Sequence, residues 1–168
     1  MAEGHKGISS KEEEIEDGHK IIYDVNLHRL DDIQRTYCPL QYQTRCRTIP
    51  TSWKIELKCE RVPDENSSYT FSMMLKRLDL SDHRVYASFS VSIFDVSGMP
   101  IYPPLERDDR MVHDDELEAT IDDFVPSDIG DLVNVTVTII IKRCHDRTNW
   151  QCASKVNTDK NSINLSKL

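Results

Sequence analysis

The side chains of this sequence that could do chemistry include a group of carboxylates in its second half. Carboxylate oxygens are the ligands that Ca²⁺ prefers in proteins, so a C2-like calcium-binding module is one interpretation. The aspartates that would supply those oxygens are Asp108, Asp109, Asp114, Asp115, Asp122 and Asp123. Calcium loops alternate their carboxylates around a turn-forming glycine, whereas these acids occur as adjacent pairs. The pattern therefore fits a solvated acidic loop better than a calcium site.

Cysteine and histidine are the other residues that could bind a metal. Cys144 and His145 are adjacent, and they could be combined with Cys152 and His113. Zinc sites of this type usually contain a C-x-x-C pair or a comparable spacing, which this chain lacks. We therefore predict no metal site and no cofactor, and we interpret Cys144 and Cys152 as surface thiols of a C-terminal tail.

Catalytic motifs are missing from the sequence. It contains no nucleophile elbow, no phosphate-binding loop and no H-E-x-x-H pattern, although histidine and cysteine are both present. Only five glycines are available for loops that would cradle a cofactor with their backbone. We therefore predict that the protein is not an enzyme.

Composition limits the partners and the compartment. With 168 residues and a net charge of −8, the chain is expected to be one domain that binds neither nucleic acid nor an anionic membrane. No window approaches the length of a membrane span, and the N-terminus lacks the apolar core of a signal peptide. The five cysteines are odd in number and irregularly spaced, which argues against a disulfide framework. We predict a cytoplasmic or nuclear protein.

Strands are the elements that must position these side chains. Apolar residues alternate with polar ones in five clear runs, and no apolar stripe of helical period exceeds two turns. The runs are Ile21–Leu30, Ser52–Cys59, Tyr69–Leu78, Arg84–Asp95 and Leu132–Ile141. Because short turns separate several of them, we predict an all-β fold, an antiparallel β-sandwich of seven to eight strands. Residues 1–18 are predicted to be a flexible acidic arm, 19–142 the sandwich, and 143–168 a polar tail.

The order and spacing of these runs resemble a MATH domain, the TRAF-like sandwich of eight antiparallel strands. The segment V-Y-A-S-F-S-V-S-I-F-D-V-S-G (Val85–Gly98) is the closest correspondence to the family pattern. The segments W-K-I-E-L (Trp53–Leu57), D-E-N-S-S-Y-T-F-S-M-M-L (Asp64–Leu75) and Asp123–Ile141 also match in order. The resemblance covers residues 20–142 and is nearest to the substrate-recognition domain of speckle-type POZ adaptors. Val25 stands where the family usually has a tryptophan.

The resemblance implies a shallow groove that binds a short extended peptide, partly by strand addition. It assigns Tyr69, Met73 and Phe89 to this groove, Met73 standing where the family has a second tyrosine. Phe89 also shares a face with Val85 and Ile93, so core packing is an equal alternative. Met73 and Met74 are adjacent, so one of them points inward and the other outward.

The loop that supplies further aromatic residues in the family is acidic here. Its carboxylates would line the rim of the groove and favour neutral or basic peptides, because like charges repel. These rim residues are Asp114, Asp115, Glu116 and Glu118. The resemblance thus implies a non-catalytic peptide-binding adaptor or scaffold, a monomer or weak oligomer, which could recruit substrates to ubiquitin ligation.

Overall fold

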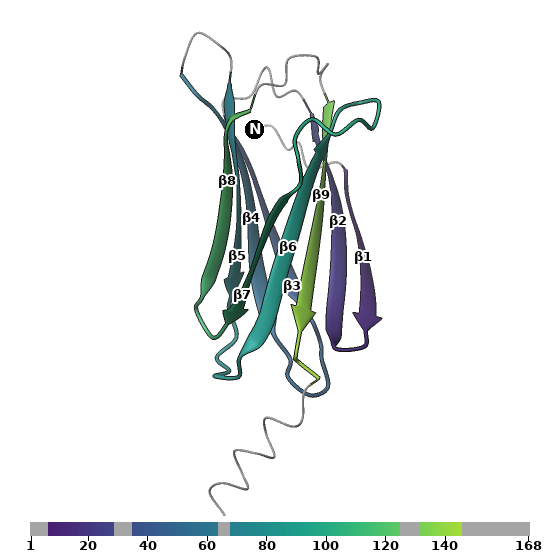
Figure 1. Cartoon of the computed structure of the whole chain (residues 1–168), viewed down its shortest axis with the longest axis vertical. Helices are drawn as coiled ribbons and strands as arrows, with labels where there is room; N and C mark the ends of the chain where they lie inside the picture. The colour runs from purple at the N-terminus through teal and green to yellow at the C-terminus, as the bar shows by residue number, and fades with distance from the viewer. Residues whose placement is uncertain (1–6, 29–34, 64–67, 125–131, 146–168) are drawn as a thin grey trace, which may run out of the picture.

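The computed structural model describes residues 7–28, 35–63, 68–124 and 132–145, and within them the chain forms two antiparallel β-sheets packed face to face (Figure 1). The predicted all-β sandwich is therefore confirmed, with nine strands in the described residues instead of seven to eight. The strands are β1 (Ile8–Ile15), β2 (Gly18–His28), β3 (Arg35–Gln43), β4 (Ser52–Arg61), β5 (Tyr69–Arg77), β6 (Val85–Phe94), β7 (Leu105–Met111), β8 (Glu116–Phe124) and β9 (Leu132–Lys142).

The order of the strands decides which of them have an open side. One sheet runs β1-β2-β9-β6-β7 and the other runs β3-β4-β5-β8. The edge strands are therefore β1 and β7 in the first sheet, and β3 and β8 in the second. β7 and β8 follow each other in the chain and lie side by side, although they belong to different sheets (Figure 1). This side of the sandwich thus presents two neighbouring edges.

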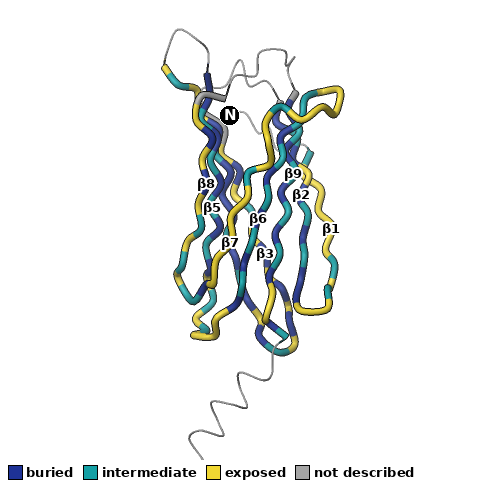
Figure 2. The backbone as a smooth tube through the Cα atoms, in the orientation of Figure 1, coloured by how far each residue is buried: buried dark blue, intermediate teal, exposed yellow. Residues whose placement is uncertain are grey.

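Strict alternation in the central strands builds the interior. Every second residue of β5 and of β6 is buried, and the residues between them are partly exposed. A period of two places all the apolar side chains of a strand on one face, which here is the face toward the other sheet. Figure 2 shows this alternation of buried and partly exposed positions, and it shows long exposed stretches along the edge strands β1 and β7.

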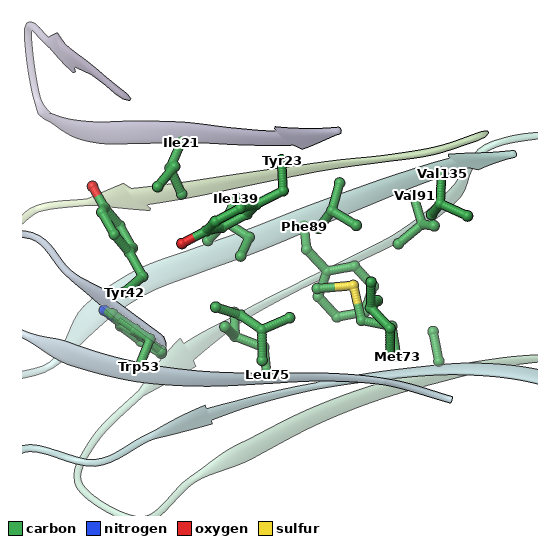
Figure 3. Close-up of a cluster of buried hydrophobic side chains, with 14 of the residues drawn as sticks. Ile21, Tyr23, Tyr42, Trp53, Met73, Leu75, Phe89, Val91, Val135 and Ile139 are labelled. Atoms are coloured by element: carbon green, nitrogen blue, oxygen red, sulfur yellow. The ribbon is translucent and has the colours of Figure 1, made fainter. Parts of the chain in front are cut away.

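Large side chains from both sheets meet in the core. Trp53 of β4 is fully buried, and its indole nitrogen donates a 2.8 Å hydrogen bond to the Thr51 hydroxyl. Met73 of β5 points toward the ring of Phe89 of β6, and Leu75 points toward the opposite sheet (Figure 3). Burying an aromatic or long aliphatic side chain contributes about 1.5–3 kcal/mol each, so this interior is the main source of stability.

The prediction of a flexible arm is wrong for residues 8–15, because they form β1. This strand pairs antiparallel with β2 from Ile8 opposite Val25 to Ile15 opposite Gly18. Its side chains are mostly exposed, so the sequence carries no hydrophobic alternation there. The backbone hydrogen bonds to β2 hold β1 in place, and backbone pairing leaves no trace in the pattern of side chains.

The prediction that the acidic stretch is a loop is also wrong, because this stretch contains most of β7 and the start of β8. The two strands are separated by the turn Val112–Asp115, where the Asp115 carboxylate accepts a 2.8 Å hydrogen bond from the Val112 amide. β7 is an edge strand with five exposed residues in succession, which hid it from a search for alternation.

A buried arginine ties this turn to the rest of the sandwich. Arg77, at the end of β5, is 0% exposed, and its guanidinium donates to the carbonyl of Met111 at 2.7 Å and to that of His83. Its backbone amide donates to the carbonyl of Asp115 at 3.0 Å. The turn between the two edge strands is therefore fixed from inside the protein.

Candidate functional site

The three groove residues implied by the family resemblance lie in the core. Tyr69, Met73 and Phe89 are 2%, 0% and 2% exposed. All three occupy the inward positions of β5 and β6, where alternation directs them to the opposite sheet. A peptide on the surface cannot contact such side chains, so the core alternative for Phe89 is the one the structure supports. The outward methionine is Met74, which is partly exposed on the outer face of its sheet.

The four predicted rim carboxylates do lie together, in the turn before β8 and on its first residues. Asp114, in the left-handed region with φ of 70°, and Glu116 both pair with Lys76, at 3.2 and 2.9 Å from its Nζ. Asp115 closes the turn through its bond to the Val112 amide. Glu118 is exposed and lies opposite Met74 of β5.

The outer face of β8 is mostly acidic between Glu116 and Asp122. Leu117, Ala119 and Ile121 point inward, while the exposed residues between them are Glu116, Glu118, Thr120 and Asp122. Neither Glu118 nor Asp122 forms an ion pair with any residue in the described ranges. Among the described strands β8 is bonded only to β5, so this row of carboxylates borders an open strand edge.

The neighbouring edge, β7, has a different character. Its exposed residues mix both signs of charge, from Glu106 to Arg110. The hydroxyl of Tyr86 donates to the Asp108 carboxylate, and this hydrogen bond raises the pKa of Tyr86. A depression of about 230 Å³ is lined by residues of β6, β7 and β9, among them two serines of β6. Its mixed lining gives no strong preference for a charged partner.

The aspartates considered as calcium ligands do not converge. Asp108 bonds Tyr86 from β7, Asp115 closes the turn, and Asp122 lies on β8. Among the described residues, no three of these acids bring an oxygen to a common point. The side chain of Asp123 lies outside the described residues. The geometry therefore gives the C2-like alternative no support.

A different set of metal-ligating side chains does converge, at the end of the sandwich near the β1–β2 turn. One ligand atom from each lies within 4.8 Å of every other, and three of the four residues are buried. We call this set the histidine–cysteine cluster; it consists of His19, Cys46, Cys144 and His145. The two imidazoles meet edge to face, with their Nε2 atoms 3.1 Å apart.

The interpretation of Cys144 as a surface thiol is therefore wrong. Its side chain is 0% exposed, and Cys46 approaches its carbonyl with Sγ at 3.5 Å. Burial raises the pKa of the Cys144 thiol to about 12. Burial also lowers the pKa of His19, and the nearby His145 lowers it further.

The metal-binding combination considered from the sequence grouped Cys144 and His145 with residues that are not their neighbours in the structure. His113 lies elsewhere, with Nδ1 2.6 Å from the carbonyl of Asp79, and Cys152 lies outside the described residues. The true neighbours are far away in the chain, since 98 residues separate Cys46 from Cys144. The adjacent Cys144-His145 pair was a usable signal, but only the pairing of β2 with β9 brings His19 to it.

Comparison with known proteins gives no family for this chain. The described residues contain no helix that is long and apolar enough to cross a membrane. No protein-family model matches the chain, and no curated protein matches its sequence.

Proposed function

We propose that this protein is a non-catalytic peptide-binding module that captures an extended segment of a partner protein along the open edge of β8. The observation that carries the proposal is the position of β8, an edge strand with carboxylates at three of the four outward positions from Glu116 to Asp122. An unpaired strand edge is a template for a further strand, and strand addition is a common mode of peptide recognition.

The spacing of the carboxylates defines the chemistry of the partner. In a strand added to β8, every second side chain would lie on the same face as Glu118 and Asp122. Opposite charges on directly facing strand residues stabilise the pair, and like charges destabilise it. The preferred segment is therefore extended, with lysine or arginine at alternate positions, and acidic segments are disfavoured.

Two neighbours modify this edge. Lys76 neutralises part of the charge of Glu116, so the centre and far end of β8 carry the unbalanced charge. Met74 lies opposite Glu118 on β5 and is partly exposed, which offers an adaptable apolar contact to a long lysine or arginine stem.

The resemblance to MATH domains supports the same function. It implies eight antiparallel strands over residues 20–142, and β2–β9 are eight strands between Gly18 and Lys142. On this resemblance we propose an adaptor or scaffold role, which could include recruitment to ubiquitin ligation. The cysteines of the described residues, Cys38, Cys46, Cys59 and Cys144, are buried and free of disulfides, which suits the reducing cytoplasm or nucleus.

The test is binding of a designed pair of peptides. A nine-residue fluorescent peptide, as long as β8, would alternate lysine and threonine, and its counterpart would carry glutamate for lysine. We expect fluorescence anisotropy to show binding of the lysine peptide alone. Glu118→Lys should weaken it roughly five-fold, the effect of about 1 kcal/mol.

The matched control is Glu13→Lys. It makes the same charge change on β1, an edge strand of the five-stranded sheet, whereas β8 belongs to the four-stranded sheet. It should leave binding nearly unchanged. Equal binding of both peptides, or equal weakening by the two variants, would show that the attraction is not localised at β8 and would overturn the proposal.

A further inference from the structure

The spacing within the histidine–cysteine cluster matches a metal coordination sphere. Around a tetrahedral Zn²⁺, two imidazole nitrogens stand about 3.3 Å apart and two thiolate sulfurs about 3.8 Å apart, given the usual zinc–ligand bond lengths. The Nε2 atoms of His19 and His145 are 3.1 Å apart, and all four ligand atoms lie within 4.8 Å of one another. A small adjustment of side chains would close this arrangement around one ion.

These groups satisfy one another poorly by hydrogen bonding alone. Two facing Nε2 atoms can share only one proton, and protonating both imidazoles would set two cations against each other. Cys46 makes a 3.5 Å contact to a carbonyl, and Cys144 makes a 3.9 Å contact to the carbonyl of Ile141, so both thiols are weakly bonded. A divalent cation bound by two neutral imidazoles and two thiolates, with the two thiol protons released to solvent, would satisfy all four groups at once.

We propose that the histidine–cysteine cluster is a zinc site with all four side chains as ligands. Two sulfurs and two imidazole nitrogens in a compact arrangement suit Zn²⁺, whereas Ca²⁺ and Mg²⁺ require oxygen ligands. Four protein ligands leave no position for water or substrate, which is the arrangement of structural sites rather than catalytic ones. The ion would therefore stabilise the fold.

The origin of the ligands shows what the ion would join. His19 is the second residue of β2 and Cys144 follows the end of β9, two neighbouring strands of one sheet, whereas Cys46 lies in the loop between β3 and β4 of the other sheet. The zinc would clamp the two sheets together at this end of the sandwich. It would also hold the end of β9 against the β1–β2 turn, where the Arg143 amide donates 2.9 Å to the carbonyl of Asp17.

The backbone around the cluster is arranged to aim these ligands. Arg45 and Arg143, which directly precede the two cysteines, adopt φ values of 49° and 63°, a region that residues other than glycine rarely enter. At Gly18 an added Cβ would lie 1.8 Å from the carbonyl oxygen of Ile141, so only glycine permits this approach of β2 to β9. The Nδ1 of His145 lies 3.5 Å from the carbonyl of Glu16, which turns Nε2 toward the cluster.

An entry path for the ion lies on the histidine side. A polar pocket of about 470 Å³ is bounded by both imidazoles together with Glu14, Arg45, Arg47 and Thr48. The side chain of His145 is 23% exposed, so this ligand can be reached from solvent. The cysteines close the inner side of the site.

Elemental analysis of the purified 168-residue chain, expressed in zinc-supplemented medium and purified under reducing conditions, tests the proposal. We expect one zinc per chain, and Co²⁺ added to the metal-free protein should give the visible and thiolate charge-transfer bands of a tetrahedral site. Cys46→Ser should abolish both signals. Cys59→Ser, which alters a buried cysteine of the core outside the cluster, should retain both.

Since Cys46→Ser could fail to fold, His145→Ala provides a second variant at the most exposed ligand, and it should also lose the metal. Absence of zinc from the wild-type protein together with no cobalt spectrum would overturn the proposal. So would a disulfide between Cys46 and Cys144, detected by intact mass before and after reduction. Peptide binding at β8 is measured separately, so either proposal can fail without the other.

Discussion

The buried guanidinium of Arg77 donates to both carboxylate oxygens of Asp79, with Nε 3.0 Å from Oδ2 and Nη2 2.9 Å from Oδ1. Asp79 in turn accepts from the amide of Ser52 at 3.0 Å, so the pair joins the end of β5 to the start of β4. The same guanidinium bonds the carbonyl of Met111 at the end of β7. One ion pair therefore supports the turn that carries the acidic rim.

Replacing Asp79 by alanine should destabilise the protein by about 3 kcal/mol. The substitution leaves the Arg77 charge buried without its counterion, and uncompensated buried charges are among the most destabilising defects. Urea unfolding followed by tryptophan fluorescence, to which the buried Trp53 contributes, measures the change. Asp82→Ala, at an exposed position of the same loop, is the control and should change stability by less than about 0.5 kcal/mol. Equal midpoints for the two variants would contradict the structural role of the pair.

Glu56 should make the protein sensitive to acid. Hydrogen bonds from Lys54 and from the Tyr37 hydroxyl lower the pKa of Glu56 to about 2. A glutamate in the unfolded chain has a pKa of about 4.3. The stabilisation that ionised Glu56 contributes is therefore complete above that pH and is lost as the pH falls toward 2. The free energy of unfolding of wild type should therefore approach that of Glu56→Gln between about pH 4 and pH 2. A constant difference across this range would contradict the assignment.

The central strands could be predicted because packing between the sheets requires an apolar side chain at every second position. In β6, Val85, Ala87, Phe89, Val91 and Ile93 alternate with polar residues, and the structure buries each of them. The same pattern carried the resemblance to MATH domains, but it could not separate a core position from a groove position. A core position lies on the face toward the other sheet and a groove position on the face toward solvent, and only the packing of the two sheets decides which face of β6 is covered.

The edge strands and the histidine–cysteine cluster could not be predicted, for two different physical reasons. β1 and β7 are held by backbone hydrogen bonds, which any polar sequence can make, so their side chains vary freely. The cluster depends on the pairing of Gly18 with Lys142 and on a loop from the other sheet. Spacing along the chain carries no information about such contacts.

The adjacent residues Met73 and Met74 provide a matched test of the inner and outer faces of β5. Met73→Ala removes a fully buried side chain and should cost about 3 kcal/mol of stability. Met74→Ala changes a partly exposed position and should cost less than about 1 kcal/mol, while it weakens binding of the lysine peptide. Chemical denaturation and fluorescence anisotropy measure the two effects. If Met73→Ala left stability intact and reduced peptide binding, the groove interpretation of that residue would be restored.

Zinc and calcium should act differently on the melting temperature of the metal-free protein. A ligand that binds only the native state stabilises it by about 2.7 kcal/mol at a hundred times its dissociation constant, which corresponds to about 5 °C or more for a chain of this size. Added Zn²⁺ should raise the melting temperature through the histidine–cysteine cluster, and His145→Ala should remove the increase. Millimolar Ca²⁺ should have no effect, because the candidate ligands do not converge: Asp108 lies on β7, Asp115 in the turn and Asp122 on β8. An increase with calcium that disappears in Asp122→Asn would revive the C2-like alternative, whereas an increase with zinc in His145→Ala equal to that of wild type would place the metal elsewhere.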